Sequence, residues 1–206
     1  PTPGRNSNAV STAVAIATGK VRGRARGEVA EFLGIPYGAD TQPTRFEAPK
    51  PAASWKGARD ALAYGATCPQ GGGGDAQSED CLVINVWTPS LEKSAKKPVL
   101  VYIHGGGYSG GSGSSPVTNG AELAGRGDAA VLTLNHRLNV FGHLYLPHLV
   151  REERYAASGN AGLLDLVLAL HWVRDNIASF GGDPECVTVF GQSGGGGKIA
   201  CLMAMP

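Results

Sequence analysis

One serine in this sequence has the neighbours that a nucleophilic serine needs. Ser193 stands between Gly191 and Gly195 in the run Gly-Gln-Ser-Gly-Gly, which matches the pattern G-x-S-x-G. The pattern carries chemistry when a strand precedes it and a helix follows, because the glycines then relieve the crowding of a tight turn that exposes the hydroxyl. Unpaired N–H groups at the helix N-terminus favour the negative charge that develops in acyl transfer. We therefore predict that Ser193 is a nucleophile that forms an acyl-ester intermediate.

A second glycine cluster offers the backbone donors that such a serine requires. The run His-Gly-Gly-Gly at 104–107 directly follows the apolar segment 99–103. Glycines at this point let main-chain N–H groups approach a substrate carbonyl without interference from side chains. We predict that Gly106, Gly107 and Gly194, the residue after the serine, form an oxyanion hole. Each such donor typically contributes about 3 kcal/mol to the stability of the transition state.

The sequence after the serine lacks the groups that would activate it. In proteins that carry the serine on such a turn, the acid and the histidine of the catalytic triad follow it along the chain. Only 13 residues follow Ser193, and they include no Asp, Glu or His. We therefore expect residues 1–206 to be the N-terminal portion of a single domain whose triad acid and His lie outside this chain. The chain alone is then expected to be inactive.

None of the five histidines is assigned as the catalytic base. His104 and His136 each directly follow an apolar segment. His143 and His148 fall in a loop region, and we expect them to be solvated or to line a pocket. His171 lies on the apolar face of a predicted helix, which favours a packed position in the core.

The elements expected around these residues alternate between strand and helix. Segment 162–179 repeats its apolar residues every three or four positions and ends at glycines, which predicts a crossover helix. Strand, helix, strand in this order favours an α/β fold with a central, mostly parallel sheet and helices on both faces. Four segments are apolar on both faces, as strands buried in a parallel sheet are: 82–88, 99–103, 130–134 and 187–190.

The N-terminal part of the chain has a different pattern. Short, weakly alternating segments between residues 14 and 33 predict an antiparallel edge of the sheet. Residues 1–12 are expected to be a mobile lead-in.

Composition and charge exclude several classes of partner. The sequence has 18 Lys and Arg against 17 Asp and Glu, a net charge of +1, and the basic residues are scattered. Such a chain has no field that would draw it to nucleic acid or to an anionic membrane. Its apolar runs are too short to span a bilayer. No cysteine or histidine spacing indicates a metal site, and we expect neither a metal nor a cofactor.

The four cysteines leave the redox state open when only their spacing is considered. Cys68 and Cys81 flank a polar, glycine-rich segment that can fold back as a loop. A disulfide bond across that loop would stabilise the fold by about 3 kcal/mol. Two unrelated thiols fit the spacing equally well.

With the serine turn and the glycine loop together, the sequence resembles the N-terminal portion of the type B carboxylesterases, the family that includes the cholinesterases. The likeness runs from about Val14 to the last residue, and two positions depart from it. The family often has Glu where this chain has Gln192 and Ala where it has Gly194, but glycine still offers its N–H. The matching motifs are Phe-Leu-Gly-Ile-Pro-Tyr at 32–37, Arg-Phe at 45–46, Ser-Glu-Asp-Cys-Leu at 78–82, Asn-Val-Trp at 85–87, Asn-His-Arg-Leu at 135–138, Phe-Gly at 141–142, Gly-Asn at 159–160, Gly-Leu-Leu-Asp at 162–165 and Phe-Gly-Gly-Asp-Pro at 180–184.

The resemblance implies an α/β-hydrolase fold, incomplete in this chain, and a serine carboxylic ester hydrolase that acts on a small-molecule ester. The rest of the domain would then be continuous or associated with this part. The resemblance also implies a disulfide bond between Cys68 and Cys81, a structural ion pair of Arg45 with Glu79, and a secreted or periplasmic setting. It further implies structural positions for His104 and His136. It assigns no role to Cys186 or Cys201, and we expect both to be buried, inert thiols.

Two points stay open at the level of sequence. Trp87, Tyr108 and Phe141 are candidates for lining the approach to the serine, although Trp87 also fits a simple core position. Some relatives of this fold are catalytically silent binding or adhesion modules, which is the alternative function. The retained serine and the intact glycine loop favour the enzyme.

Overall fold

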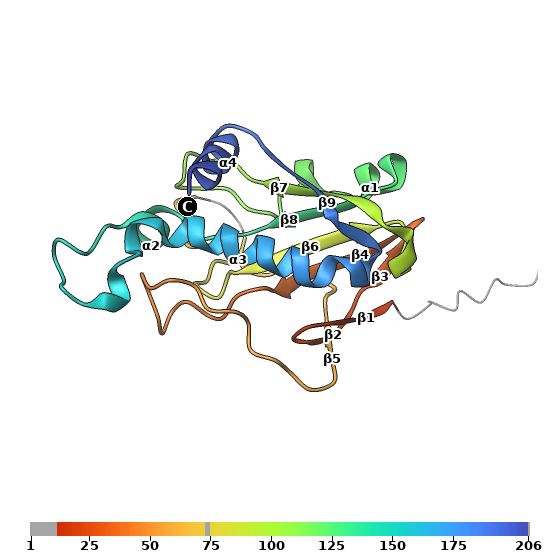
Figure 1. Cartoon of the computed structure of the whole chain (residues 1–206), viewed down its shortest axis with the longest axis horizontal. Coiled ribbons are helices and arrows are strands. Elements are labelled where there is room, and N and C mark those ends of the chain that lie inside the picture. The colour runs from red at the N-terminus through yellow and green to blue at the C-terminus, as the bar shows by residue number, and fades with distance from the viewer. Residues whose placement is uncertain (1–11, 73–74, 206) are drawn as a thin grey trace, which may run out of the picture.

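The structure is a computed structural model that describes residues 12–72 and 75–205, so the expected lead-in, residues 1–12, lies outside it except for its last residue. Its centre is a six-stranded sheet in the order β3-β4-β6-β8-β7-β9 (Figure 1). A smaller sheet, in the order β1-β2-β5, lies beside β4 of the central sheet. The strands are β1 (Ala13–Ile16), β2 (Gly19–Arg22), β3 (Arg24–Arg26), β4 (Val29–Pro36), β5 (Ala58–Asp60), β6 (Val83–Thr88), β7 (Lys97–Ile103), β8 (Ala130–Leu134) and β9 (Gly182–Gly191).

The central sheet is mixed in strand direction. β7 runs parallel to β8 and to β9, whereas β4 and β6 run antiparallel to their neighbours. The antiparallel N-terminal edge is therefore confirmed, but the parallel part of the sheet is smaller than predicted, because segment 82–88 runs antiparallel to both neighbours. All six residues of β6 are buried. A strand covered on both faces is apolar throughout whichever way it runs, so its composition did not reveal its direction.

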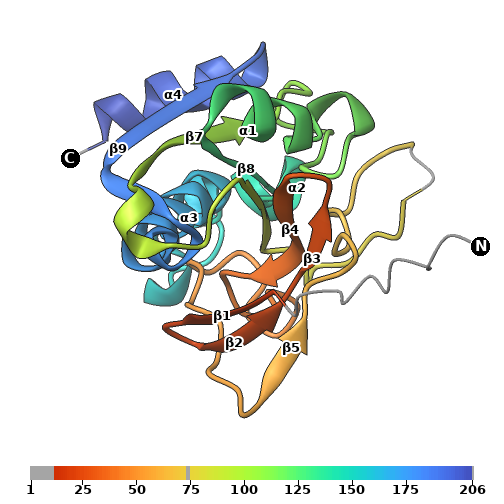
Figure 2. The ribbon, with the colours of Figure 1, turned by 90° about the vertical axis from the view of Figure 1, so that its right-hand side faces the viewer.

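Helices cover both faces of this sheet, and Figure 2 shows α1 and α3 on opposite sides. Because side chains alternate along a strand, Val131 of β8 packs toward α1, whereas Leu132 belongs to the larger core cluster under α3 and α4. The α-helices are α1 (Ala121–Gly127), α2 (Asn139–His143), α3 (Ala161–Asn176) and α4 (Gly194–Ala204). Short 3-10 helices lie at Lys93–Ala95, Pro116–Thr118, Glu153–Tyr155, Ser158–Asn160 and Ile177–Phe180.

α3 is the predicted crossover helix between β8 and β9. The stretch Glu153–Phe180 is long and apolar enough, by length and composition only, to cross a membrane, yet 50% of its most apolar window is buried inside the protein. Leu166 and Val173 on its inner face belong to the core. His171 is exposed, so its predicted core position is wrong. The face that His171 shares with Leu164 is only partly buried, because the buried stripe lies on the other side of the helix.

A buried ion pair fixes the start of α3. The carboxylate of Asp165 accepts hydrogen bonds from the backbone N of Arg137 at 2.8 Å and from its Nη2 at 2.7 Å. Burial raises the pKa of Asp165, and the hydrogen bonds from Arg137 act against that rise. Nη1 of Arg137 also donates to the carbonyl oxygen of Glu47 at 2.9 Å. The pair therefore ties α3 both to the loop after β8 and to the irregular segment that holds Glu47.

The cysteines differ from expectation. Cys68 and Cys81 are both buried and their thiols interact, but the structure holds them as free thiols. The disulfide bond is therefore not confirmed. Cys186 and Cys201 are exposed, so the prediction of buried thiols is wrong for both. Cys186 lies on β9, which pairs on one side only in the described chain, and Cys201 lies on α4 with its Sγ 3.9 Å from the Tyr108 hydroxyl oxygen.

Candidate active site

Ser193 lies on a sharp turn between a strand and a helix. β9 ends at Gly191, α4 begins at Gly194, and Ser193 has the backbone angles φ 55° and ψ −122°, a combination that L-residues rarely adopt. Glycine is needed before the turn, because a Cβ on Gly191 would lie 2.7 Å from the carbonyl oxygen of Ile103. The side chain of Ser193 is exposed. The predicted strand-turn-helix arrangement is thus confirmed, and its serine is held in a strained conformation.

The glycine loop after β7 lies against this turn. Gly106 and Gly107 both have positive φ, 92° and 59°. A Cβ on Gly194 would lie 3.0 Å from the backbone N of Gly107, and a Cβ on Gly105 would lie 3.4 Å from the Cβ atom of Ser193. The structure therefore brings the predicted nucleophile and the three predicted donors together. They gather at the carboxyl ends of β7 and β9, neighbouring parallel strands, which is where open α/β sheets bind ligands.

The described residues offer the serine no base. Within 12–72 and 75–205, no histidine or carboxylate is hydrogen-bonded to the Ser193 hydroxyl. His104 and His136 instead donate from Nδ1 to the carbonyl oxygens of Gly105, at 2.9 Å, and Arg137, at 3.0 Å. Their rings stack with centroids 4.6 Å apart. These contacts give both histidines the structural positions that the sequence predicted.

The electrostatics of this pair follow from burial. Burial, with a smaller effect of the Lys198 charge, lowers the pKa of His104 to about 4. Burial and the neighbouring His104 hold the pKa of His136 well below its ordinary value. Both rings are therefore neutral at pH 7, and neither carries a charge into the site.

Sequence reasoning missed one residue beside the site. Lys198, on α4, is fully buried, and its Nζ donates to the carbonyl oxygen of His104 at 3.0 Å. The only signal in the sequence was a single charge inside the run Gly-Gly-Gly-Gly-Lys-Ile-Ala-Cys-Leu-Met.

The three aromatic candidates occupy different environments. Trp87 is buried in the core on the α1 side, where its Nε1 donates to Oε2 of Glu31 at 2.7 Å, so its core interpretation is confirmed. Tyr108 follows the glycine loop directly. Phe141 stacks on Phe46 with centroids 6.5 Å apart. A role of Tyr108 or Phe141 in contacting substrate stays a prediction.

The ion pair implied for Arg45 and Glu79 is confirmed. Nε of Arg45 donates to Oε2 of Glu79 at 2.8 Å, and its Nη2 bonds the other carboxylate oxygen.

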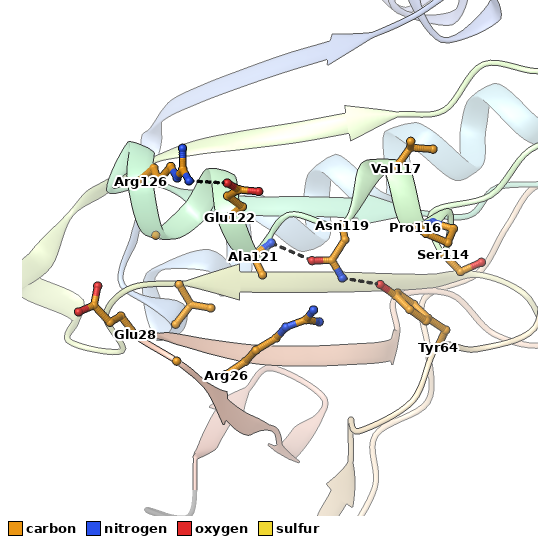
Figure 3. Close-up of a pocket in the computed structure, with 13 residues that line it drawn as sticks. Arg26, Glu28, Tyr64, Ser114, Pro116, Val117, Asn119, Ala121, Glu122 and Arg126 are labelled. Carbon is orange, nitrogen blue, oxygen red and sulfur yellow. Dashed lines mark hydrogen bonds and ion pairs between the residues drawn. The ribbon is translucent and has the colours of Figure 1, made fainter.

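A broad groove lies away from these residues. Its volume is about 870 Å³, and its lining includes Arg26 and Tyr64 on one side and Glu122 and Arg126 of α1 on the other (Figure 3). Asn119, another lining residue, donates from Nδ2 to the Tyr64 hydroxyl at 3.2 Å. None of the predicted site residues lines this groove, so it is not the candidate active site.

The described residues hold no group of three or more His, Cys, Asp or Glu side chains that could bind a metal ion.

Comparison with known proteins agrees with this arrangement. A model of the carboxylesterase family matches residues 10–206. The chain is 47% identical to the para-nitrobenzyl esterase of Bacillus subtilis (strain 168), over 91% of this chain and 39% of that protein. It is 40% identical to the fumonisin B1 esterase of Sphingopyxis macrogoltabida, over 92% of this chain and 36% of that protein.

Solved structures agree as well. The Geobacillus stearothermophilus carboxylesterase EST55 superposes with a TM-score of 0.91 at 43% identity, covering 95% of this chain and 40% of that one. The chain thus spans about two fifths of the length of these relatives. Its sheet and helices are those of the N-terminal part of an α/β-hydrolase fold. By sequence and by structure, the chain belongs to the carboxylesterase family.

Proposed function

We propose that this chain is the N-terminal part of a serine carboxylic ester hydrolase. Ser193 Oγ attacks the carbonyl carbon of a small-molecule ester and gives its proton to a histidine supplied by sequence outside this chain. The carbonyl oxygen becomes an oxyanion held by the backbone N–H groups of Gly106, Gly107 and Gly194. The C–O bond to the alcohol then breaks, the alcohol leaves with that proton, and water hydrolyses the acyl-serine to release the acid.

The observation that carries this proposal is the close approach of the two loops. The position of a Cβ on Gly194 is only 3.0 Å from the backbone N of Gly107, so the residue after the serine lies beside the glycine loop. An oxyanion hole needs donors from both loops around one point, and the closeness of the two loops supports that arrangement. The relatives named as esterases support the same reaction class.

The alternative, a catalytically silent binding module, accounts for less of the site. A strained, non-glycine backbone such as that of Ser193 costs of order 1–3 kcal/mol and gathers at functional sites. A module that only binds a partner has no need of that strain or of an exposed serine beside glycine donors.

Three further expectations belong to this proposal. Residues 1–206 form the N-terminal portion of one domain, continuous or associated with the rest of it. The protein is secreted or periplasmic, and there Cys68 and Cys81, already in contact as buried thiols, oxidise to a disulfide bond.

Labelling with a fluorophosphonate tests the proposal in the full-length protein. We expect covalent labelling of the wild type and none of Ser193→Ala. Hydrolysis of p-nitrophenyl acetate should fall by about five orders of magnitude in that variant, because the nucleophile is lost. Ser54→Ala is the matched control, since Ser54 is exposed and far along the chain from the site. A folded wild type that takes up no label would overturn the proposal, as would undiminished labelling of Ser193→Ala.

A further inference from the structure

The helix that follows the serine contains a buried positive charge. Lys198 lies in the second turn of α4 and has no exposed surface. Among the described residues it forms no ion pair. Removing an ammonium group from water without a counter-charge is costly, so its contacts must stabilise it in another way.

Those contacts lie at the two ends of the glycine loop. The Nζ of Lys198 donates to the carbonyl oxygen of His104, at 3.0 Å, and lies 5.1 Å from the centroid of the Tyr108 ring. His104 directly precedes the three glycines 105–107, and Tyr108 directly follows them. One ammonium group therefore contacts both residues that bracket the predicted oxyanion donors.

We propose that Lys198 is a positioning residue for the oxyanion hole: it holds both ends of the loop 105–107 against the helix that begins at the serine turn. This inference rests on the proposed function of Ser193. Its physical reason is that glycines have no side chains with which to anchor their own loop, while catalytic donors must be held within about 0.5 Å of their working positions. A charge-assisted hydrogen bond and a cation–π contact supply that anchor.

Tyr108, at the far end of the glycine loop, is also held by a contact that does not involve Lys198. Its own φ is 65°, and its carbonyl oxygen accepts a hydrogen bond from the backbone N of Asn139 at 2.7 Å. The ring that Lys198 contacts is thus fixed from its backbone side, so losing the ammonium would release mainly the His104 end of the loop.

The charge state of Lys198 gives the proposal a pH signature. Burial lowers the pKa of Lys198 to about 8. The titratable groups that face it are His104 after β7, His136 after β8, His143 on α2 and Tyr108, whose hydroxyl contacts Cys201 of α4. Burial lowers the pKa of all three histidines, so they stay neutral as the pH rises from 7 to 9. Loss of the Lys198 proton therefore weakens the anchor over that range.

Substitution of Lys198 in the full-length protein tests the role. In Lys198→Met we expect kcat for p-nitrophenyl acetate to fall about 10- to 100-fold while KM changes less than about two-fold, because the donors are misplaced but substrate still binds. The midpoint of urea unfolding should be unchanged or higher, since an apolar side chain replaces a buried charge. Amides of residues 105–108 should exchange their hydrogens faster. Lys56→Met, at an exposed lysine, is the matched control.

The pH profile and a second variant separate positioning from a merely structural effect. In the wild type kcat should decline as the pH rises through about 8, and in Lys198→Met this limb should be absent. Lys198→Gln keeps a neutral donor for the His104 carbonyl, so it should recover part of kcat without the alkaline limb. A folded Lys198→Met with wild-type kcat and unchanged amide exchange would overturn the inference, and so would a loss of kcat matched by a loss of stability. A wild type that takes up no fluorophosphonate would instead overturn the proposed function.

Discussion

Two backbone hydrogen bonds at the start of α4 support the strained backbone of Ser193. The backbone N of Gly197 donates to the Ser193 carbonyl oxygen at 3.1 Å, and that of Gly195 donates to the Gln192 carbonyl oxygen at 2.9 Å. The start of α4 thus offsets a cost of order 1–3 kcal/mol at one residue. Beside it, His104 and His136 each use Nδ1 for a backbone carbonyl, while their buried Nε2 atoms have no partner among the described residues.

At the scale of single residues, the lowered pKa of His104 leads us to predict that the protein loses stability in acid. Its pKa is about 4 in the folded protein and about 6.5 in the unfolded chain. Between these values the unfolded state binds a proton that the folded state does not, so stability is fully present above pH 6.5 and is lost as the pH falls toward 4. The expected loss is of order 3 kcal/mol for this group.

Urea unfolding at pH 7.5 and pH 5 measures this effect. His104→Asn keeps a side-chain N–H for the Gly105 carbonyl but cannot titrate, so its midpoint should change less between the two pH values. His148→Asn, at an exposed histidine, should behave as the wild type does. Equal pH dependence in the wild type and His104→Asn would contradict the prediction.

At the scale of elements, the candidate site lies where β7 and β9 end side by side, and α3 leads into β9 as the crossover from β8. α3 is bound at its start by Asp165, whose side chain is fully buried against Arg137. At its end, Asn176 accepts a hydrogen bond from the backbone N of Ala17 at 2.8 Å. The crossover helix is therefore fastened by polar contacts at both ends and by apolar packing between them.

Breaking the first of these contacts should destabilise the whole fold. Asp165→Asn leaves the buried Arg137 guanidinium without its counter-charge, and we expect a loss of about 3–5 kcal/mol in the free energy of unfolding. Urea denaturation measures it. Asp175→Asn is the matched control on the same helix, because the Asp175–Arg174 pair is exposed, and its midpoint should stay at the wild-type value. Similar midpoints for the two variants would refute the role of the buried pair.

At the scale of the whole molecule, the described chain carries the predicted nucleophile and oxyanion donors but no base for the serine. The edge of the central sheet at β9, the strand that leads to Ser193, is open in the described chain. Among the residues that the structure describes, β9 pairs with a strand on one side only, and Phe190 near its end is 37% exposed. The relatives are about two and a half times as long as this chain, as their coverage of about 40% requires.

The 206-residue chain expressed alone is therefore expected to be inactive. Without a histidine to take the Ser193 proton, hydrolysis of p-nitrophenyl acetate should not exceed that of its Ser193→Ala variant. The full-length protein, measured in parallel, is the positive control. Robust turnover by the 206-residue chain that disappears in Ser193→Ala would show that the described residues do contain a base.

The sequence was sufficient where local geometry leaves little choice. The turn at Ser193 and the loop at 105–107 need glycines at fixed places, so their pattern predicted both the elements and their contact. Features that depend on long-range packing could not be predicted in this way. A strand buried on both faces is apolar whichever way it runs, so the composition of β6 did not reveal its direction. The exposure of Cys186 depends on which strand lies beside β9. Lys198 escaped prediction because a lysine on a helix is normally solvated, and only the packed structure shows the two loop ends that enclose it.

The pairing of β7 with β9 also bears on how the protein folds. Val99 lies opposite Val187, with α1, β8, α2 and α3 between them in the sequence. Closing so long a loop costs chain entropy before the pairing repays it, so this contact belongs among the slow, non-local steps of folding. β9 also cannot dock until the ribosome has released the segment that contains it. The glycine loop and the serine turn thus meet only at a late stage of folding, and a partly folded chain does not yet hold the predicted oxyanion donors beside its serine.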